Sequence, residues 1–362
     1  MQEIHNTFMK RALSLASKGK GFVNPNPMVG AVLVKDGEVI GEGYHTAFGK
    51  PHAEIEAIRN TRKSVDGATI YVTLEPCSHY GKTPPCAEAL IKAGVKEVVI
   101  ASLDPNPLVA GRGVKMLEDA GIKVIVGIEE EASKELNRIF FKYIQTKTPY
   151  VLMKTAMTLD GKIATHTGDS KWVSGEISRK KVHQLRHQLM GIMVGINTVL
   201  KDSPKLDCRL EGKVRQPIKI IVDSLLRTPL DAKIWEHEAK VIIATTKLPS
   251  IEIIQKYTDK GAEVFVAGEN RVDLAHLMKE LGERGVDSIL LEGGATLNAS
   301  ALQAGIVNEV WTFVAPKIVG GTVAPTSVGG EGVTLMKDAY QLTGFQVEPS
   351  GEDWLFKAKV NK

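Results

Sequence analysis

Cysteine is scarce in this sequence: its 362 residues contain three, Cys77, Cys86 and Cys208. So small and odd a number argues against the dense disulfide framework of small secreted proteins and favours a reducing compartment. No apolar run approaches the roughly 18 residues of a membrane span, and residues 1–6 do not begin a signal peptide. We therefore expect a cytoplasmic protein that does not enter a membrane.

A strong charge of either sign is also missing. The 46 lysines and arginines stand against 42 aspartates and glutamates, which gives a formal net charge of +4. This mild and dispersed excess argues against nucleic-acid binding and suits phosphorylated small molecules. Hydrophobic residues make up 43% and charged residues 24%, as in ordinary globular proteins, and the length favours two domains.

Two short motifs contain the residue types of a catalytic zinc site. His52 stands two residues before Glu54, and Cys77 and Cys86 follow further along the chain. One imidazole and two thiolates provide three protein ligands, which leaves the fourth position of a tetrahedral zinc for water and lowers the pKa of that water to about 7. Glu54 is then placed to move protons between the water and a leaving amine.

The local pattern supports the zinc motifs. Helical patterns begin at His52 and at Cys86, and residues 69–74 read as a buried strand that ends just before Cys77. The two helix starts would face one point, and the positive ends of their dipoles favour thiolate over thiol. The sequence therefore predicts that these distant residues meet at one metal.

Two other interpretations of the same residues stay open: a structural zinc, or a pair of reduced, buried cysteines. Structural zinc sites usually have four protein ligands in a compact spacing, and only three good ligands are present here. This count favours the catalytic interpretation. His79 is the residue that could supply a fourth ligand.

Zinc nucleobase deaminases carry H-x-E followed by P-C-x-x-C. The present chain matches H-x-E and P-C, but eight residues instead of two separate Cys77 from Cys86. The inserted residues 78–85 are polar and basic, and they look suited to hold an anion.

Further motifs accompany the zinc residues along both halves of the chain. In the first half they are Asn24-Pro-Asn-Pro27, Val29-Gly30-Ala31, Gly41–His45, Thr73–His79, Gly81–Cys86, Asp104–Pro107 and Val109–Gly113. In the second half they are Ala156–Lys162, Gly168–Trp172, Arg186, Val194-Gly195, Asn197–Val199, Asp202–Pro204, Leu206, Arg209, Asp223 and Glu292–Ala295. Together they resemble the RibD family of bifunctional riboflavin-biosynthesis enzymes, nearly end to end and including the longer cysteine spacing.

The resemblance implies an α/β chain with a cytidine-deaminase-like three-layer domain followed by a dihydrofolate-reductase-like domain. Alternating strands and helices in the first half independently predict a parallel or mixed sheet with helices on both faces. A polar link at residues 146–149 marks the boundary. We expect a zinc-dependent deaminase domain over residues 1–147 and an NADPH-dependent reductase domain over 148–362.

The second half shows less by itself. It has no G-x-G-x-x-G after a strand, so no Rossmann fingerprint. An apolar strand at residues 289–291 precedes Glu292 and two glycines, and the helix that follows could seat a phosphate, although glycines at helix caps are common. Arg186 and Arg209 are either surface charges or clamps for a phosphate. Trp172 is either a core residue or a neighbour of the cofactor.

For the reductase site, the resemblance implies two sets of residues. NADPH would contact Ala156, Trp172, Thr198, Asp202, Gly294, Ala295, Thr296, Leu297, Asn298, Ala299 and Ser300. The substrate would contact Lys154, Ser170, Arg186, Leu206, Arg209 and Glu292, with the arginines at its phosphate.

For the deaminase site, the resemblance adds substrate contacts to the three ligands and Glu54. Asn24 could equally be a turn residue, since Asn before Pro is typical of turns, and Lys82 could be an ordinary solvated lysine. The implied substrate residues are Asn24, His45, His79 and Lys82.

The implied reaction has two steps. A phosphorylated ribosylaminopyrimidine would lose its amino group by zinc-dependent hydrolysis, and NADPH would then reduce its ribosyl chain to a ribityl chain. Rival hypotheses are a nucleoside or tRNA-base deaminase with a non-catalytic second domain, and a binding module with a structural zinc. We also expect a homo-oligomer, a dimer or a tetramer, with neither nucleic acid nor membrane as a partner. No role is predicted for Cys208.

Overall fold

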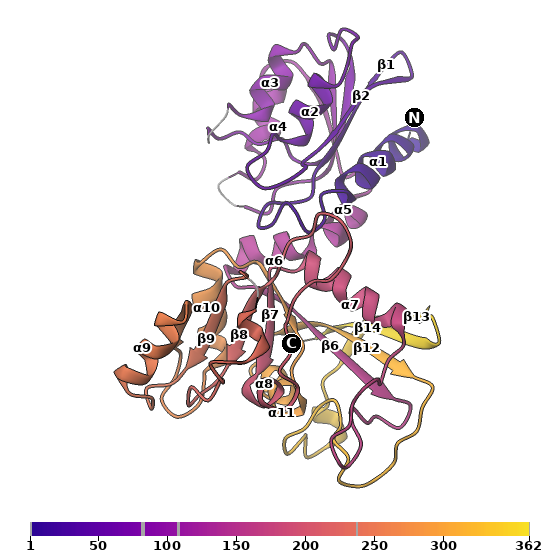
Figure 1. Ribbon diagram of the computed structural model, residues 1–362. Coiled ribbons are helices and arrows are strands. Elements are labelled where there is room, and N and C mark those ends of the chain that lie inside the picture. The colour runs from indigo at the N-terminus through magenta and orange to yellow at the C-terminus, as the bar shows by residue number, and fades with distance from the viewer. Residues whose placement is uncertain (1, 81–83, 107–108, 237, 362) are drawn as a thin grey trace. The chain divides into compact units, whose positions relative to one another are not determined.

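The computed structural model describes residues 2–80, 84–106, 109–236 and 238–361. It divides into two compact units, residues 1–146 and 147–362, each with its own sheet (Figure 1). Within the described ranges, no helix combines the length and the apolar character needed to cross a membrane.

A five-stranded sheet with the order β2-β1-β3-β4-β5 forms the centre of the N-terminal unit. β1 is antiparallel to both β2 and β3, whereas β3, β4 and β5 are parallel. Asp36 and Gly37 join β1 to β2, and both have the positive φ that a tight hairpin turn of this type requires. The strands are β1 (Gly30–Lys35), β2 (Glu38–Tyr44), β3 (Thr69–Leu74), β4 (Glu97–Ser102) and β5 (Lys123–Val126).

Helices cover both faces of this sheet, so the unit has three layers (Figure 1). Successive side chains of a strand point to opposite faces. Ile70 and Val72 therefore pack in the core under α2, α3 and α4, while Tyr71 between them packs with Met9 of α1. The helices are α1 (Gln2–Ser17), α2 (Ala53–Arg59), α3 (Cys86–Lys92), α4 (Arg112–Asp119), α5 (Glu130–Leu136) and α6 (Arg138–Thr146).

One expected helix, over about 130–145, is interrupted at Asn137, which separates α5 from α6. The buried Asn137 amide makes two hydrogen bonds to the backbone of Met28: its Oδ1 accepts from the N–H at 2.8 Å, and its Nδ2 donates to the carbonyl at 2.9 Å. The side chain thus connects the break in the helix with the segment that follows the Asn24–Pro27 turn. A periodicity argument does not detect such a long-range bond.

The C-terminal unit contains a nine-stranded sheet with the order β10-β9-β8-β7-β11-β6-β12-β14-β13. The strands from β6 to β12 are mutually parallel, so their carboxyl ends lie at one edge, and β14 and β13 extend the sheet in antiparallel fashion. The strands are β6 (Tyr150–Thr158), β7 (Gly191–Gly195), β8 (Ile218–Val222), β9 (Val241–Thr245), β10 (Ala262–Val266), β11 (Ser288–Leu291), β12 (Val307–Ala315), β13 (Leu342–Ser350) and β14 (Asp353–Val360).

Two buried clusters lie on opposite faces of this sheet. Met193 and Leu291 belong to the cluster under α10 and α11, whereas Ile192 and Val194 belong to the cluster with α8 and α9. α7 packs through Val182 on β12 and β14. The helices are α7 (Glu176–Gln188), α8 (Ile196–Asp202), α9 (Ile251–Asp259), α10 (Leu274–Glu283), α11 (Ala295–Gln303) and the short 3-10 turns Lys233–Trp235 and Met336–Asp338.

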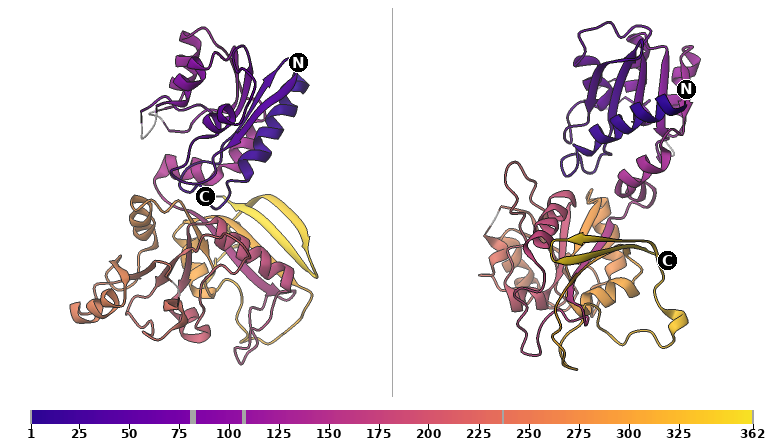
Figure 2. Two further views of the ribbon diagram at one scale, coloured as in Figure 1. Left: turned by 45° about the horizontal axis from the view of Figure 1, so that its top comes forward. Right: turned by 90° about the vertical axis from the view of Figure 1, so that its right-hand side faces the viewer.

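The strand β13 was not expected from the sequence. Most of its residues are exposed on both faces, so it lacks the alternation of polar and apolar positions that marks a half-buried strand. Among the residues that the structure describes, it pairs only with β14 and forms the edge of the sheet (Figure 2).

Candidate functional site

Three side chains from separate segments meet at one point in the N-terminal unit. His52 is the N-cap of α2, Cys86 is the first residue of α3, and Cys77 lies in the segment after β3. Their ligand atoms all lie within 4.8 Å of one another. His52 Nδ1 is 3.2 Å from Cys86 Sγ and 3.6 Å from Cys77 Sγ. Tetrahedral zinc, with bonds of about 2.0–2.3 Å, places neighbouring ligand atoms about 3.5 Å apart, so the cluster fits this metal.

Hydrogen bonds favour the thiolate at Cys77. Its Sγ accepts a hydrogen bond from the backbone N–H of Cys86 at 3.2 Å. The Cys86 thiol and the His52 ring lower the pKa of Cys77 to about 4. The hydrogen bond with Cys77 also raises the pKa of His52, and this effect is larger than the opposing effect of burial. A thiolate beside an imidazole is the donor set that zinc prefers.

Glu54 lies next to the cluster without joining it. Its side chain is 3% exposed, and its Oε2 has no hydrogen-bond partner among the described residues. Burial raises the pKa of this carboxyl group above its ordinary value, although the charge of His52 opposes the shift. A buried carboxyl group with one free oxygen and a raised pKa is suited to exchange protons with a bound molecule.

His45 lies beside the cluster and is hydrogen-bonded to Asn26. Asn26 Nδ2 donates to His45 Nε2 at 3.1 Å, and His45 Nδ1 is 3.0 Å from the Pro51 carbonyl, to which it donates. The His45 ring is buried and stands edge-on to the ring of His52 with 5.6 Å between centroids. Both nitrogens of His45 thus have partners within the protein, and burial lowers its pKa.

The other predicted deaminase residues are placed as follows. Asn24 is half-buried and precedes Pro25 through a cis peptide bond, and His79 is exposed in the segment between the two cysteines. Lys82 lies outside the described residues. Contacts of these side chains with a substrate remain predictions.

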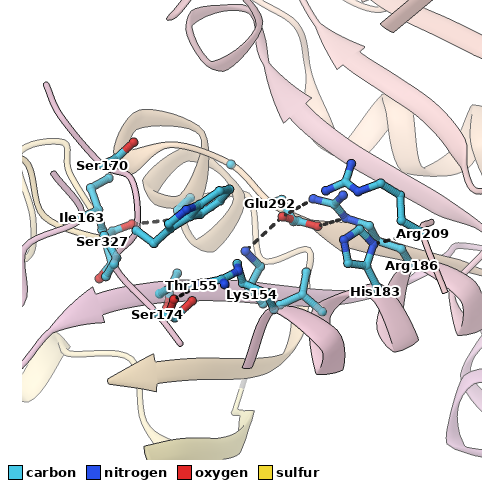
Figure 3. A pocket seen from close by; sticks show the side chains of 17 residues that line it. Lys154, Thr155, Ile163, Ser170, Ser174, His183, Arg186, Arg209, Glu292 and Ser327 are labelled. Atoms are coloured by element: carbon cyan, nitrogen blue, oxygen red, sulfur yellow. Dashed lines mark hydrogen bonds and ion pairs between the residues drawn. The ribbon is translucent and has the colours of Figure 1, made fainter. Parts of the chain in front are cut away.

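The C-terminal unit contains a cavity of about 300 Å³ (Figure 3). It extends from Ser170 and Ser327 at one end to Arg186 and Arg209 at the other, with Lys154 between them. The lining residues are Lys154, Thr155, Ala156, Ile163, Ser170, Trp172, Val173, Ser174, Arg179, Val182, His183, Arg186, Arg209, Glu292, Gly293, Asn298 and Ser327.

A buried carboxylate organises the charged end of this cavity. Glu292 follows β11 and pairs with Arg186 of α7 through two hydrogen bonds of 2.7 and 3.0 Å and with Lys154 of β6 at 3.0 Å. Burial by itself would raise the pKa of Glu292, but the charges of Arg186 and Lys154 reverse the shift and lower it. Two cations around one carboxylate leave a net positive charge that suits an anionic ligand.

Two more residues extend this positive end. The backbone N–H of Arg209 donates to His183 Nδ1 at 3.2 Å, so that nitrogen carries no proton. Burial, together with the charges of Arg186 and Arg209, lowers the pKa of His183 to about 4. The guanidinium group of Arg209 is 56% exposed and pairs with Asp207.

Arg179 and His183 also line the cavity, although no sequence motif predicts them. They lie on the same face of α7 as Arg186, at positions i, i+4 and i+7, and all three line the cavity. Recognising α7 as a helix would have grouped them. Arg179 also stacks on the ring of Trp172 at 4.6 Å.

The glycine-rich segment after Glu292 leads directly into α11. Gly294 is the N-cap, and a Cβ placed on it would lie 3.7 Å from Thr198 Oγ1, which brings the first turn of α8 beside the start of α11. Gly293 and Asn298 line the cavity, and the buried Asn298 Oδ1 has no partner among the described residues. Asn298 Nδ2 donates to the Ser327 carbonyl at 2.8 Å. A free acceptor and an adjacent helix start are features that a nucleotide can use.

Two family models match the chain. The cytidine and deoxycytidylate deaminase zinc-binding region matches residues 2–102, and the RibD C-terminal domain matches residues 149–356. The riboflavin biosynthesis protein RibD of Actinobacillus pleuropneumoniae is 51% identical over 352 residues, which cover 96% of this chain and 93% of that protein. The chain belongs to the RibD family.

Other RibD proteins are similar to this chain over nearly its whole length. The protein of Aquifex aeolicus is 44% identical, with 98% of both chains covered. Among solved structures, Acinetobacter baumannii RibD has a TM-score of 0.91 at 38% identity, with 100% of both chains covered. A Thermotoga maritima deaminase and reductase has a TM-score of 0.88 at 38% identity, with 99% of both chains covered.

As a member of the RibD family, the chain is a bifunctional enzyme of riboflavin biosynthesis, a deaminase and a reductase that uses Zn²⁺ and NADPH. The expected α/β fold, with a cytidine-deaminase-like and a dihydrofolate-reductase-like half, is confirmed. The match to the RibD C-terminal domain weighs against the rival hypothesis of a nucleoside or tRNA-base deaminase with a non-catalytic second half.

The RibD residues expected at the reductase site do not all lie at the cavity. Lys154, Ser170, Arg186, Arg209 and Glu292 line it from the substrate set, and Ala156, Trp172 and Asn298 line it from the NADPH set. The side chain of Leu206 is 2% exposed in a hydrophobic core cluster, so a contact with the substrate would come from its backbone. Leu297 is also a core residue, and Asp202 is exposed at the last position of α8.

Proposed function

We propose that residues 1–147 deaminate a diaminopyrimidinone ribosyl phosphate and that residues 148–362 reduce the ribosyl chain of the product. The Thermotoga maritima relative is titled a diaminohydroxyphosphoribosylaminopyrimidine deaminase and 5-amino-6-(5-phosphoribosylamino)uracil reductase, which supports this order of substrates. The observation that carries the proposal is the cluster of His52, Cys77 and Cys86 beside the buried, unpartnered oxygen of Glu54.

In the deaminase, His52 Nδ1 and the sulfurs of Cys77 and Cys86 would hold the metal. A zinc ion bound there supplies a Lewis acid that lowers the pKa of water. Glu54 takes a proton from the attacking water at its free Oε2 and delivers it to the leaving amine, and its raised pKa suits both transfers. Asn24, His45, His79 and Lys82 contact the substrate, and Asn26 holds the ring of His45 in place through a hydrogen bond.

In the reductase, the positive end of the cavity receives the substrate phosphate. Arg209 offers an exposed guanidinium group there, and Arg186 is held in place by Glu292. Lys154 lies between the two ends of the cavity (Figure 3), so its ammonium group can contact the sugar chain. Trp172 and the start of α11 would hold the cofactor, which would supply the hydride. The main task of the protein is then to place the two reacting carbons.

A single experiment tests both halves. Purified, zinc-loaded protein receives the diaminopyrimidinone ribosyl phosphate, and ammonia and NADPH absorbance are followed together. We expect ammonia release and an NADPH loss that depends on it. Ammonia without NADPH loss would contradict the reductase assignment, and the absence of both signals would contradict the proposed substrate.

We also propose that the enzyme is a homo-oligomer of the cytoplasm. The free edge strand β13 carries Leu342, Phe345 and Val347, and 60% of Phe345 is exposed. Exposed apolar edge strands favour pairing with another chain. The three free cysteines, at 77, 86 and 208, suit a reducing compartment. Light scattering of the wild type and of Phe345→Glu tests the oligomer: a lower mass for the variant supports it, and a monomeric wild type contradicts it.

A further inference from the structure

Glu75 is a buried carboxylate that the mechanism above does not use. It follows β3 directly, precedes the zinc ligand Cys77 by two residues, and is 4% exposed. Its two oxygens accept hydrogen bonds from the backbone N–H groups of Asp104 and of residues at the start of α4. The donors are Asp104 at 3.2 Å and Gly111 at 3.0 Å to Oε2, and Gly113 at 2.9 Å and Val114 at 3.4 Å to Oε1.

A side chain with two acceptor oxygens suits this set of contacts. Two oxygens with about four lone pairs can accept four N–H groups, whereas the amide of glutamine would turn an NH₂ donor toward some of them. The backbone of Glu75 is fixed as well, since its N–H donates to the Ser102 carbonyl at 3.0 Å. Glu75 therefore connects the end of β3 with the start of α4.

The connection reaches the metal ligand itself. Cys77 is bound on its other side to α3, since its carbonyl accepts from the N–H of Ala87 at 3.2 Å and its sulfur accepts from the N–H of Cys86 at 3.2 Å. The short segment between Glu75 and Cys77 is thus held at both ends. Because Pro76 is the single residue between Glu75 and Cys77, a displacement of Glu75 is transmitted to the Cys77 sulfur.

A glycine on the opposite side keeps the two segments in contact. A Cβ placed on Gly113 would lie 2.1 Å from the Pro76 carbonyl oxygen and 3.2 Å from Glu75 Oε1. Gly113 is inside α4 and does not have a positive φ, so its backbone would accept alanine and its helix propensity would improve. The contact with Pro76 is therefore the reason that a side chain does not fit.

The segment held by Glu75 also borders the deaminase site. It begins at the half-buried Asp104, whose pKa is raised by burial and is also affected by the charges of Glu75, His79 and Cys77. Asp104 thus lies within electrostatic range of a zinc ligand and of a residue between the two cysteines. Glu75 sets the distance between this segment and the cluster.

We propose that Glu75 is a positioning residue of the deaminase, which fixes Cys77 for the metal and holds Asp104 and the start of α4 against the site. The inference rests on the proposed zinc site. Groups that orient metal ligands typically change metal affinity or activity about 10- to 100-fold when they are replaced. We expect effects of this size on both zinc affinity and the kcat of ammonia release.

The test uses two variants of the full-length protein that disturb the contact from opposite sides, Glu75→Gln and Gly113→Ala. Zinc affinity is measured by competition with a chromophoric chelator, and kcat and KM of ammonia release are measured with saturating zinc. Both variants should bind zinc about 10- to 100-fold more weakly and show a lower kcat. Reduction of separately supplied deaminated substrate by NADPH should be unchanged, because that site lies in the other unit.

Two matched controls separate positioning from loss of stability. Glu97→Gln removes another carboxylate of the same sheet, which pairs with Lys123 at 2.6 Å, and Leu117→Ala opens a cavity in the core under α4. Both should lower stability and keep the zinc affinity of the folded protein. If Glu75→Gln does not fold, the zinc affinity and kcat of Gly113→Ala test the positioning role.

Folded variants with wild-type zinc affinity and kcat would overturn the positioning role and leave the proposed function intact. An equal loss of zinc affinity in Leu117→Ala would also overturn it, because stability would then explain the effect. A wild type that binds no zinc would overturn the proposed function and this inference together.

Discussion

Each half of this protein contains a buried carboxylate at its site, and the two differ in their partners. Glu54 is 3% exposed and has one oxygen without a partner among the described residues, so burial raises its pKa. Glu292 is also buried, but Arg186 and Lys154 surround it, and its pKa is lowered despite burial. The same type of side chain is therefore suited to carry a proton in one half and to stay a fixed anion in the other. Since both carboxyl groups are buried, the difference between their pKa shifts comes from their charged partners.

Replacement of Glu54 should give the largest effect. Glu54→Gln keeps the size of the side chain and removes its capacity to carry a proton, so ammonia release should fall by about 10²- to 10⁴-fold. Zinc content and the reductase step should be unchanged. Single-turnover ammonia assays and metal analysis check this prediction, and ammonia release at the wild-type rate would remove Glu54 from the proton path.

Replacement of Arg186 tests the opposite carboxylate. Arg186→Met leaves Glu292 with only Lys154, and breaking a buried pair on one side typically costs about 3–5 kcal/mol of the free energy of unfolding. The KM for the phosphorylated substrate should rise in the reductase step only. The matched double variant Arg186→Met with Glu292→Gln should be more stable than Arg186→Met alone.

Denaturant unfolding and reductase kinetics measure these two effects. If the double variant is no more stable than the single variant, then a buried Glu292 without Arg186 does not lower the free energy of unfolding, and the prediction is wrong. An unchanged KM in Arg186→Met would remove Arg186 from the phosphate clamp.

The third prediction concerns pH. His183 has a folded-state pKa of about 4 against an ordinary value of 6.5, so below pH 6.5 the unfolded chain binds a proton that the folded chain does not. Stability should therefore be lost as the pH falls from 6.5 to about 4, and the lowered pKa of Glu292 adds a loss at more acidic pH. The free energy of unfolding, measured at a series of pH values, should depend less steeply on pH for His183→Asn than for the wild type. An equal pH dependence of the variant and the wild type would contradict the assignment.

The smallest effect is expected for a pair without burial. Lys63 and Glu38 lie 2.7 Å apart, but both side chains are mostly exposed, at 62% and 70%. The pair lowers the pKa of Glu38, yet water and salt screen it. Lys63→Ala should leave the Tm unchanged in a calorimetric scan, and a clear drop would show that exposed pairs count here as buried ones do.

Much of the deaminase site could be predicted because its chemistry uses rare residue types. His52, Cys77 and Cys86 stand close together in a sequence with three cysteines, and the helix starts and strand end around them are local patterns. The interruption of the helix at Asn137 could not be predicted, because its cause is a pair of hydrogen bonds to Met28, more than a hundred residues away along the chain.

The reductase site was less accessible from the sequence. Its cavity takes residues from 154 to 327, and lysine, arginine and glutamate are common on every protein surface. The resemblance named Arg186 and Glu292, but not that they bind each other. It also placed Leu206 at the substrate, whereas its side chain packs in the core.

The sequence by itself determined the metal, the two-domain organisation and most strands and helices, because ligand type and hydrophobic period are properties of neighbouring residues. Only the tertiary structure decided which charges meet. The pairing of Glu292 with Arg186 and Lys154 and the four N–H groups on Glu75 each join segments far apart in the chain. The fold also leaves one buried oxygen of Glu54 without a partner among the described residues. The energy of a charge depends on its partners and on the water around it, and folding sets both.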